Sequence, residues 1–293
     1  MNGALLVDKP AGPTSHDVVA RVRRVLKTRA VGHTGTLDPF ATGLLIVLAG
    51  RCTRLARFVE QQAKTYFATA KLGVTTTTDD LLGEPTGGPA EVRTGGKPER
   101  AVVEAVLAGF LGPQKQRPPA FSAKRVDGER SYAKARRGEL LDLAEVDVVV
   151  HAVELVGFEY PEVRFRITVS PGTYIRGIAR DLGERLGTGA HLTALRREAI
   201  GSLQVDRAVR LDALTDAAAL LPPLAVLSHL ARVELTETDA KVIGFGQAVR
   251  IEAAPAVPLD QSVAAVAPGE RLVAIGKLRE SWFHPEVVLE AAG

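Results

Sequence analysis

The strongest pattern for chemistry in the sequence is the segment Gly32-His-Thr-Gly-Thr-Leu-Asp-Pro39. Its two glycines let the backbone come close to a ligand, and Pro39 restricts Asp38 to an extended backbone geometry. A carboxylate held in this way can act as a nucleophile or as a general base. The residues alone also fit a simpler interpretation, in which the aspartate only caps the backbone of a turn.

Regular elements on both sides must position this segment. Thr14-Ser15 are typical of a helix N-terminus, and the apolar residues that follow recur at helical spacing, with Arg21 and Arg24 off that stripe. The segment leads into a short apolar run at 44–48, which predicts a buried strand. By the same reasoning we expect helices over 53–62, 101–111 and 175–186, strands over 64–72 and 164–169, and a loop over 83–98.

The composition is ordinary for a globular protein. Of the 293 residues, 46% are hydrophobic and 24% are charged. No apolar run approaches the roughly 20 residues of a membrane span, and the first residues lack the pattern of a secretory signal. We therefore expect a cytoplasmic protein without membrane contact. Cys52 is the single cysteine, which excludes an internal disulfide and a cysteine-based metal cluster.

Charge is distributed unevenly along the chain. Residues 1–60 carry nine Lys/Arg against four Asp/Glu, and residues 114–137 carry eight against two. From 232 to the end the balance reverses, with six basic and nine acidic residues. Segregated positive charge is typical of a surface that binds a polyanion, although solvated helix faces would give the same pattern.

The segment Gly32 to Gly43 resembles the signature of the TruB family, the bacterial tRNA pseudouridine-55 synthases. Four further segments resemble the same family in the same order, so the resemblance extends from residue 3 to about 205. They are Leu6-Val-Asp-Lys-Pro10; Lys64-Thr-Tyr66; Phe121-Ser-Ala-Lys124 with Tyr132-Ala-Lys-Ala-Arg-Arg-Gly138; and Gly172-Thr-Tyr-Ile-Arg176 with Ala194-Leu-Arg-Arg197. The C-terminal region resembles the PUA domain of the family more loosely.

The resemblance implies the fold and the domains. It implies an α/β (α+β) catalytic domain over residues 1–228, built on a mixed, largely antiparallel sheet, with an RNA-gripping insertion at about 110–138. A small PUA-like β-barrel that binds RNA would follow over residues 229–293. The implied partner is the T stem-loop of tRNA. No protein partner is implied, and we expect a monomer.

The resemblance also implies the chemistry. Uridine at position 55 of the T loop would become pseudouridine, with Asp38 as the nucleophile on a flipped-out base. The reaction breaks an N-glycosidic bond and joins C5 to the same ribose carbon, so it needs neither a metal nor another cofactor. Attack at the ribose anomeric carbon and attack at C6 of the base both remain open.

Further roles follow from the resemblance residue by residue. Arg176 would hold Asp38 in its charged form. Tyr66 would stack on the target base and is a candidate to remove the C5 proton. The remaining expected substrate-binding residues are Tyr174 and Leu195 in the uridine pocket, His33 in space vacated within the RNA loop, Lys9, and the insertion cations Lys124, Arg125 and Arg130 on phosphates.

The sequence departs from the family pattern at 72–83. Thr76 and Leu82 stand where we expect aspartates, whereas Asp80 keeps its place.

Two alternative functions stay open. One is a pseudouridine synthase for another RNA, and the other is an RNA-binding folding helper with an incidental active site. Intact Asp38, Tyr66 and Arg176 argue against the second, because binding alone does not require them.

Overall fold

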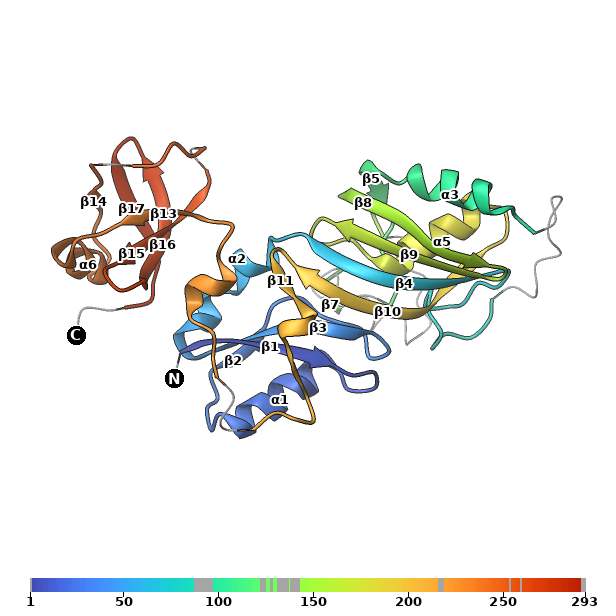
Figure 1. Ribbon diagram of the computed structural model, residues 1–293, viewed down its shortest axis with the longest axis horizontal. Helices are drawn as coiled ribbons and strands as arrows, with labels where there is room; N and C mark the ends of the chain where they lie inside the picture. Colours follow the sequence, from blue (N-terminus) through green and yellow to red (C-terminus); the bar gives the residue numbers. More distant parts are fainter. Residues whose placement is uncertain are drawn as a thin grey trace.

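The computed structural model describes residues 2–86, 97–121, 125–126, 129–130, 137, 143–215, 219–252, 254–258 and 260–290. The described chain forms a long mixed sheet with helices against it and a separate five-stranded sheet at one end (Figure 1). Within these residues, no helix is both long and apolar enough to cross a membrane.

The large sheet has ten strands and is mostly antiparallel. Its main order is β12-β1-β3-β10-β4-β9-β8-β5, with β2 on β3 and β11 on β10. The bounds are β1 Gly3–Lys9, β2 Val31–His33, β3 Thr42–Ala49, β4 Lys64–Leu72, β5 Gly112–Gln116, β8 Val146–Glu159, β9 Glu162–Val169, β10 Ala190–Ile200, β11 Leu203–Gln204 and β12 Val209–Arg210. Only the β1–β12 and β3–β10 pairs in it are parallel. The predicted mixed, largely antiparallel sheet is confirmed.

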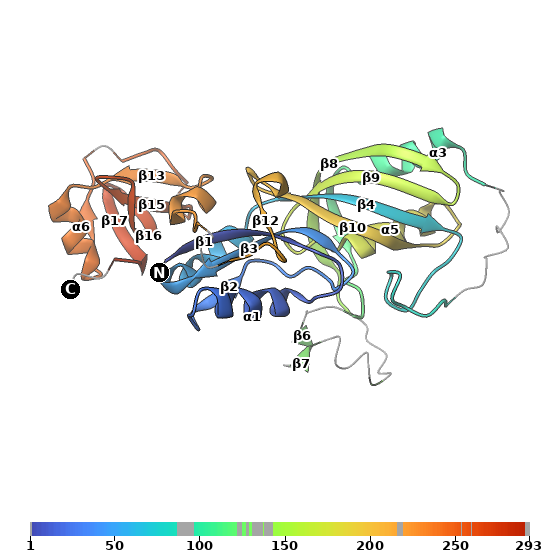
Figure 2. The same cartoon turned by 60° about the horizontal axis from the view of Figure 1, so that its bottom comes forward.

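The N-terminal half of the sheet is buried on both faces. Along β1, Leu5 and Val7 join a cluster with helix α1 (Ser15–Val25), whereas Leu6 belongs to a second cluster on the opposite face. Strands buried on both faces read as continuous apolar runs, which explains why β3 lacks alternation. Figure 2 shows α1 below β1 and β3.

Helix α1 begins where the sequence predicts. Thr14 is its N-cap, and its hydroxyl accepts a hydrogen bond from the amide of Asp17. The Asp17 carboxylate accepts one from the amide of Thr14 in return, which completes a capping box. Cap residues of this kind contribute typically about 1 kcal/mol to helix stability.

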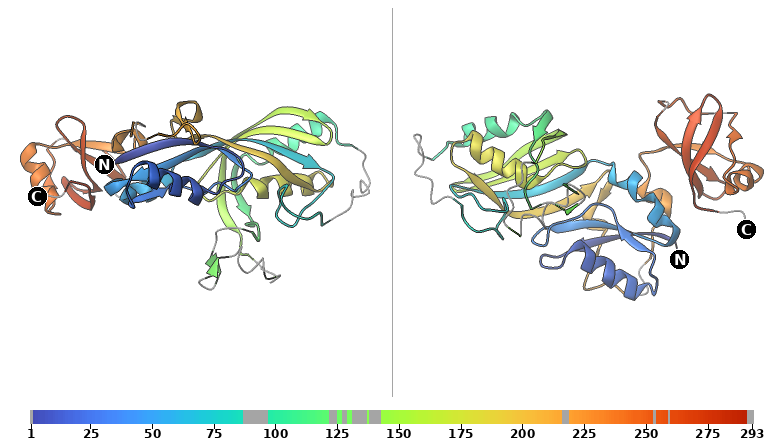
Figure 3. Two further views of the ribbon diagram at one scale, coloured as in Figure 1. Left: turned by 90° about the horizontal axis from the view of Figure 1, so that it is seen from below. Right: turned by 180° about the vertical axis from the view of Figure 1, so that it is seen from behind.

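The second half of the sheet carries its own core. Helices α3 (Arg100–Ala108) and α5 (Ile175–Arg185) share a buried cluster with β4 and β9. On β9, Phe165 and Ile167 are buried while Arg164 and Arg166 are exposed, as the alternation predicts. Figures 1 and 3 show both helices at the end of the molecule opposite the C-terminus.

A short parallel contact joins the two halves. Arg196 and Arg197 of β10 pair with Thr42 and Gly43 of β3. Gly43 has a positive φ of 102°, and a Cβ there would overlap the main chain of Arg197. A glycine is therefore required at this junction.

The C-terminal residues form a curled sheet in the order β13-β15-β16-β17-β14, with helix α6 (Glu237–Gly244) against it. The strands are β13 Ala231–Glu234, β14 Val249–Arg250, β15 Ser262–Ala267, β16 Arg271–Arg279 and β17 Trp282–Val288. No pairing between β13 and β14 occurs among the described residues, so the sheet is a half-barrel rather than a closed barrel.

This module shares a hydrophobic core with the N-terminal half of the large sheet. Leu6 and Ile46 lie in one buried cluster with Ile275 and Leu289. At the same interface the 3-10 helix Gly50–Leu55 and helix α2 (Ala56–Glu60) present Arg51, Arg54 and Arg57 to β17 and to the residue that follows it. Arg51 and Arg54 donate to the carbonyls of Leu289 and Val288, and Arg57 pairs with Glu286 at 2.9 Å. The C-terminal module is therefore packed on its neighbour.

Several sequence predictions need correction in detail. The helix expected over 53–62 is a 3-10 turn followed by the short α2, Ala56–Glu60. The first residues of the insertion expected at about 110–138 belong to the large sheet, because β5 pairs with β8. Its later part contains the two-residue strands β6 Arg125–Val126 and β7 Glu129–Arg130, and 122–124, 127–128, 131–136 and 138–142 lie outside the described residues.

We predict that Gly43→Ala lowers the free energy of unfolding by about 2–4 kcal/mol, because it combines backbone strain with an overlap at the β3–β10 junction. Urea denaturation measures this change. The matched control is Gly12→Ala, where φ is 106° and no atom lies within 4 Å of the position that a Cβ would take. Strain alone should cost this control about 1 kcal/mol. Equal losses in the two variants would contradict the packing argument.

Candidate active site

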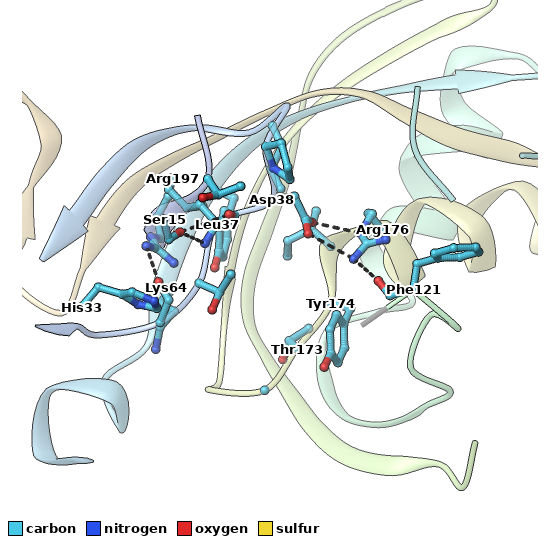
Figure 4. Close-up of a pocket in the computed structure, with 18 of the residues that line it drawn as sticks. Ser15, His33, Leu37, Asp38, Lys64, Phe121, Thr173, Tyr174, Arg176 and Arg197 are labelled. Atoms are coloured by element: carbon cyan, nitrogen blue, oxygen red, sulfur yellow. Dashed lines mark hydrogen bonds and ion pairs between the residues drawn. The ribbon is translucent and has the colours of Figure 1, made fainter. Parts of the chain in front are cut away.

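A cavity of about 810 Å³ lies where the two halves of the sheet meet (Figure 4). Its wall is contributed by the loop before β3, the start of α1, strand β4, the start of α5 and Phe121. The lining residues are Thr14, Ser15, His16, His33, Gly35, Thr36, Leu37, Asp38, Pro39, Lys64, Tyr66, Phe121, Ser170, Gly172, Thr173, Tyr174, Ile175, Arg176, Leu195 and Arg197. It therefore collects most of the residues that the sequence singled out.

The loop that carries Asp38 is fixed through its main chain. The Ser15 hydroxyl donates to the Leu37 carbonyl at 3.1 Å and accepts from the Leu37 amide at 2.9 Å. The Pro39 carbonyl accepts from the Lys9 ammonium at 3.2 Å and from the Gly12 amide at 2.8 Å. Bonds on both sides of Asp38 hold its carboxylate in one place.

Arg197 anchors the start of the same loop. Its side chain is 1% exposed, and it donates to the carbonyl of Leu44 at 2.7 Å and to that of Gly35 at 3.0 Å. The β3–β10 junction thereby fixes the loop as well as the sheet. The neighbouring Arg196 makes a two-pronged ion pair with Asp8, at 2.8 and 3.0 Å.

Asp38 and Arg176 form a two-pronged ion pair across the cavity. The guanidinium Nε lies 3.0 Å from Asp38 Oδ2, and Nη2 lies 3.2 Å from Oδ1. Arg176 is 4% exposed, and its other donors reach the carbonyls of Thr78 and Phe121 at 2.9 and 2.8 Å. This paired geometry adds direction to the charge attraction. Figure 4 shows the two side chains pointing toward each other.

Burial raises the pKa of the Asp38 carboxyl above its ordinary value, and Arg176 is the largest opposing influence. The nearby Asp80 adds to the rise, and Lys9 reduces it. The Asp38 side chain nevertheless keeps 33% of its surface exposed, and that surface faces the cavity. The guanidinium therefore favours the ionised carboxylate at a place that a ligand can reach.

Asp80 is a site residue that the sequence marked only as keeping the family pattern. Its carboxylate lies 3.5 Å from Arg176 Nη1 and accepts hydrogen bonds from the Thr78 hydroxyl and the Leu82 amide. Thr76, where we expected an aspartate, donates its hydroxyl to the Asp80 carbonyl at 2.7 Å. Thr76 therefore stabilises the local main chain through its hydroxyl, and no second carboxylate is present at this position. The Leu82 side chain is 60% exposed and lies outside the cavity lining.

Tyr66 and Leu195 face the cavity from neighbouring strands. Tyr66 lies on β4 and Leu195 on β10, and each is 7% exposed. Tyr174 enters from the N-cap position of α5 and is partly exposed. Two aromatic rings and one aliphatic side chain in a single cavity provide surfaces on which a planar base can stack.

Gln116 at the end of β5 was missed from the sequence. Its side chain is 1% exposed and bonds to both main-chain groups of Tyr174. The Tyr174 amide donates to Gln116 Oε1 at 2.8 Å, and Gln116 Nε2 donates to the Tyr174 carbonyl at 3.0 Å. A Cβ at Gly177 would come within 2.9 Å of Gln116 Nε2. Gln116 therefore holds the start of α5, and nothing in its sequence neighbourhood signalled this.

The end of the cavity away from Arg176 is lined by His33, Lys64 and Arg197 (Figure 4). Lys64 donates to the carbonyls of Glu60 and Gln62, both at 2.8 Å, and burial lowers its pKa to about 8. Burial also lowers the pKa of His33, with Arg197 adding to the effect. His33 Nδ1 is buried and has no hydrogen-bond partner among the described residues.

The other expected substrate-binding cations lie elsewhere. Lys9 is 0% exposed and donates to the carbonyls of Pro10 and Pro39, so its ammonium supports the loop and does not line the cavity. Lys124 lies outside the described residues, and only the main chain of Arg125 and Arg130 is described, in the β6–β7 pair. Their contacts with RNA stay a prediction. Within the described ranges, no group of three His, Cys, Asp or Glu residues could hold a metal ion.

The geometry by itself defines a class of enzyme. A fixed carboxylate with an arginine partner, beside aromatic side chains in a cavity large enough for a nucleoside, suits nucleophilic chemistry on a base or its ribose. The family described as "TruB family pseudouridylate synthase (N terminal domain)" matches residues 23–175, and "tRNA pseudouridylate synthase B C-terminal domain" matches 176–232. The chain belongs to the TruB family of pseudouridylate synthases.

Relatives and solved structures agree with this assignment. The chain is 42% identical to tRNA pseudouridine synthase B of Paenarthrobacter aurescens, over 98% of this chain and 95% of the relative. It is 41% identical to the protein of the same name from Thermobifida fusca, over 98% of both chains. A solved Cbf5–Nop10–Gar1 complex contains a chain with 26% identity and a TM-score of 0.77, covering 99% of this chain and 85% of that one.

We predict that Gln116→Met lowers the free energy of unfolding and slows turnover. Methionine keeps the length but removes the acceptor of the Tyr174 amide, at about 1–3 kcal/mol, whereas the Tyr174 carbonyl keeps its bond from the Ile178 amide. Chemical denaturation and single-turnover kinetics measure the two effects. Gln114→Met is the matched control, because the partly buried Gln114 lies on the same strand but accepts from Arg185 at the last turn of α5, away from Tyr174. Unchanged turnover in a stably folded Gln116→Met variant would remove Gln116 from the site.

Proposed function

We propose that this protein isomerises uridine 55 in the T loop of tRNA to pseudouridine, with Asp38 as the nucleophile. The conversion of uridine to pseudouridine follows from the family, which consists of pseudouridylate synthases. Relatives 41–43% identical to this chain are named tRNA pseudouridine synthase B, and this supports tRNA as the substrate. The two-pronged Asp38–Arg176 pair is the observation that carries the assignment of the nucleophile.

The reaction is balanced without any imported group. The bond between N1 and the ribose C1′ breaks, the base rotates, and C5 bonds to C1′. C5 then loses its proton, and N1 gains one. Both possible routes, attack at C1′ and attack at C6, begin with an ionised carboxylate. Asp38 supplies it, because the Arg176 guanidinium opposes protonation.

The cavity accounts for the other roles. A uridine in a folded loop must be flipped out, at a cost of a few kcal/mol, and stacking on Tyr66 offsets part of that cost. Tyr174 and Leu195 complete the walls of the base pocket. His33, with a buried Nδ1 that has no partner among the described residues, would contact the RNA that surrounds the flipped nucleotide. Lys9 acts through Pro39 and does not touch the substrate.

The domain assignment is part of the same proposal. Residues 1–228 form the catalytic domain, and residues 229–293 form a PUA-like module that contacts RNA outside the cavity. The insertion cations Lys124, Arg125 and Arg130 would neutralise phosphates and so position the RNA.

An RNA-binding helper without catalysis would not need a carboxylate whose guanidinium partner and flanking main chain are both held in place. We therefore favour an enzyme. Mapping the modified nucleotide separates position 55 from other RNA targets.

We expect Asp38→Asn to abolish turnover and to leave tRNA binding within about tenfold, or roughly 1.4 kcal/mol. Asparagine keeps the shape but cannot act as the nucleophile. Release of tritium from tRNA labelled at uridine C5 measures turnover. Asp147→Asn is the control, since that carboxylate is 84% exposed on β8. More than a trace of tritium release by Asp38→Asn would remove this residue from its role.

Substitutions at Tyr66 separate two roles of its side chain. Tyr66→Phe should bind tRNA nearly normally, because the ring still stacks, but should convert it about 10²–10⁴-fold more slowly if the phenol removes the C5 proton. Tyr66→Leu should lose both properties. Single-turnover rates with enzyme in excess isolate the steps after binding. A Phe variant with a near wild-type rate would leave Tyr66 as a stacking surface only.

A further inference from the structure

The outer face of the C-terminal half-barrel carries an exposed aromatic side chain between two cations. Trp282, the only tryptophan of the chain, begins β17 and is 46% exposed. The strand register places Trp282 directly opposite Arg250 of β14 and opposite Arg279 of β16. Directly opposed residues project from the same face of a sheet. Arg250, Trp282 and Arg279, which we call the Trp282 row, therefore lie side by side.

The next row of residues confirms which face this is. Phe283 follows Trp282 and is opposed by Val249 and Leu278. These three side chains are 0%, 6% and 5% exposed. Side chains alternate between the faces of a strand, so the row of Phe283 points into the core. The Trp282 row consequently points outward.

The two arginines of the row differ from three other cations of the module in their ion pairs. The module is acidic in total, but Arg232, Arg271 and Lys277 each form ion pairs with its acids. Among the described residues, neither Arg250 nor Arg279 forms an ion pair. The exposed Glu252 and Glu280 adjoin the row along the chain, but the ion pairs of the module leave both guanidinium groups of the row available to an anion.

We propose that the Trp282 row binds unpaired nucleotides of RNA, with a base stacked on the indole and the neighbouring phosphates on Arg250 and Arg279. Nucleic-acid single strands are bound by this combination of an aromatic surface and flanking cations. A rigid duplex hides the faces of its bases, so it cannot use the indole. The ligand class rests on the proposed function, which makes RNA the substrate.

The row lies far along the chain from the catalytic cavity. All residues of the cavity wall belong to 14–197, and Figure 1 shows the module with β14, β16 and β17 at the end of the molecule away from α3 and α5. A ligand that occupies both places must be a large RNA. The site therefore adds a second point of contact with the substrate.

The single tryptophan makes a direct experiment possible with the full chain. The probe is a labelled oligoadenylate of about eight nucleotides, within the ~4–16 that such sites cover; it contains no uridine for the catalytic cavity. Binding should quench tryptophan fluorescence. By anisotropy, Trp282→Leu should weaken binding by about 5- to 150-fold, the equivalent of ~1–3 kcal/mol for one stacked base, and Trp282→Phe should retain most of the affinity.

The arginines are tested by the salt dependence of binding. Arg250→Gln and Arg279→Gln should each lower the slope of log affinity against log salt by about 0.7. Lys241→Gln is the matched control, because Lys241 is an exposed cation on α6 in the same module. The probe contains no uridine and its binding involves no turnover, so a failure of the proposed catalysis would leave this result intact. Absent quenching, wild-type binding by Trp282→Leu, equal competition by duplex RNA, or the same slope change in Lys241→Gln would overturn the proposal.

Discussion

A partly buried carboxylate stays ionised more readily when a permanent positive charge lies within hydrogen-bond distance, and the rest of this structure depends on the Asp38–Arg176 pair that meets this requirement. Burial raises the pKa of the Asp38 carboxyl and so disfavours its charged form. Arg176 is suited to the task because its guanidinium stays charged at all relevant pH values and its donors match the two carboxylate oxygens. Each further donor of Arg176 ends on a carbonyl or on Asp80, so the cation itself cannot turn away.

The requirement explains why the sheet is assembled from two halves. Asp38 precedes β3 in the N-terminal half, whereas Arg176 and Tyr66 belong to α5 and β4 in the second half. The parallel contact between β3 and β10 is the place where both halves meet, and Arg197 bonds the loop that carries Asp38 to it. The same strand contact therefore joins the two halves of the sheet and fixes the position of the carboxylate.

The sequence predicted the parts of the fold that follow from local rules, such as the cap of α1 and the alternation of β9. The segments that resemble the TruB family also identified Asp38, Tyr66 and Arg176, which the structure brings to one cavity. Contacts between distant residues could not be predicted. Gln116 bonds to the main chain of Tyr174 across 58 positions, and main-chain groups carry no sequence signal. The outward arginines of the C-terminal module were not predicted, because the module is acidic in total. A net charge does not show which arginines form ion pairs with neighbouring acids.

The core shared by the C-terminal module and the N-terminal half of the large sheet has a geometric consequence. Because Leu6 and Ile46 pack with Ile275 and Leu289, and Arg51, Arg54 and Arg57 fasten the same interface, the two parts cannot swing apart without exposing apolar surface to water. The separation between Trp282 and Asp38 is thus set by the protein and not by its ligand. An RNA that touches both must present its unpaired nucleotides and its target uridine at that separation, so the length and shape of the RNA become criteria for recognition alongside its base sequence.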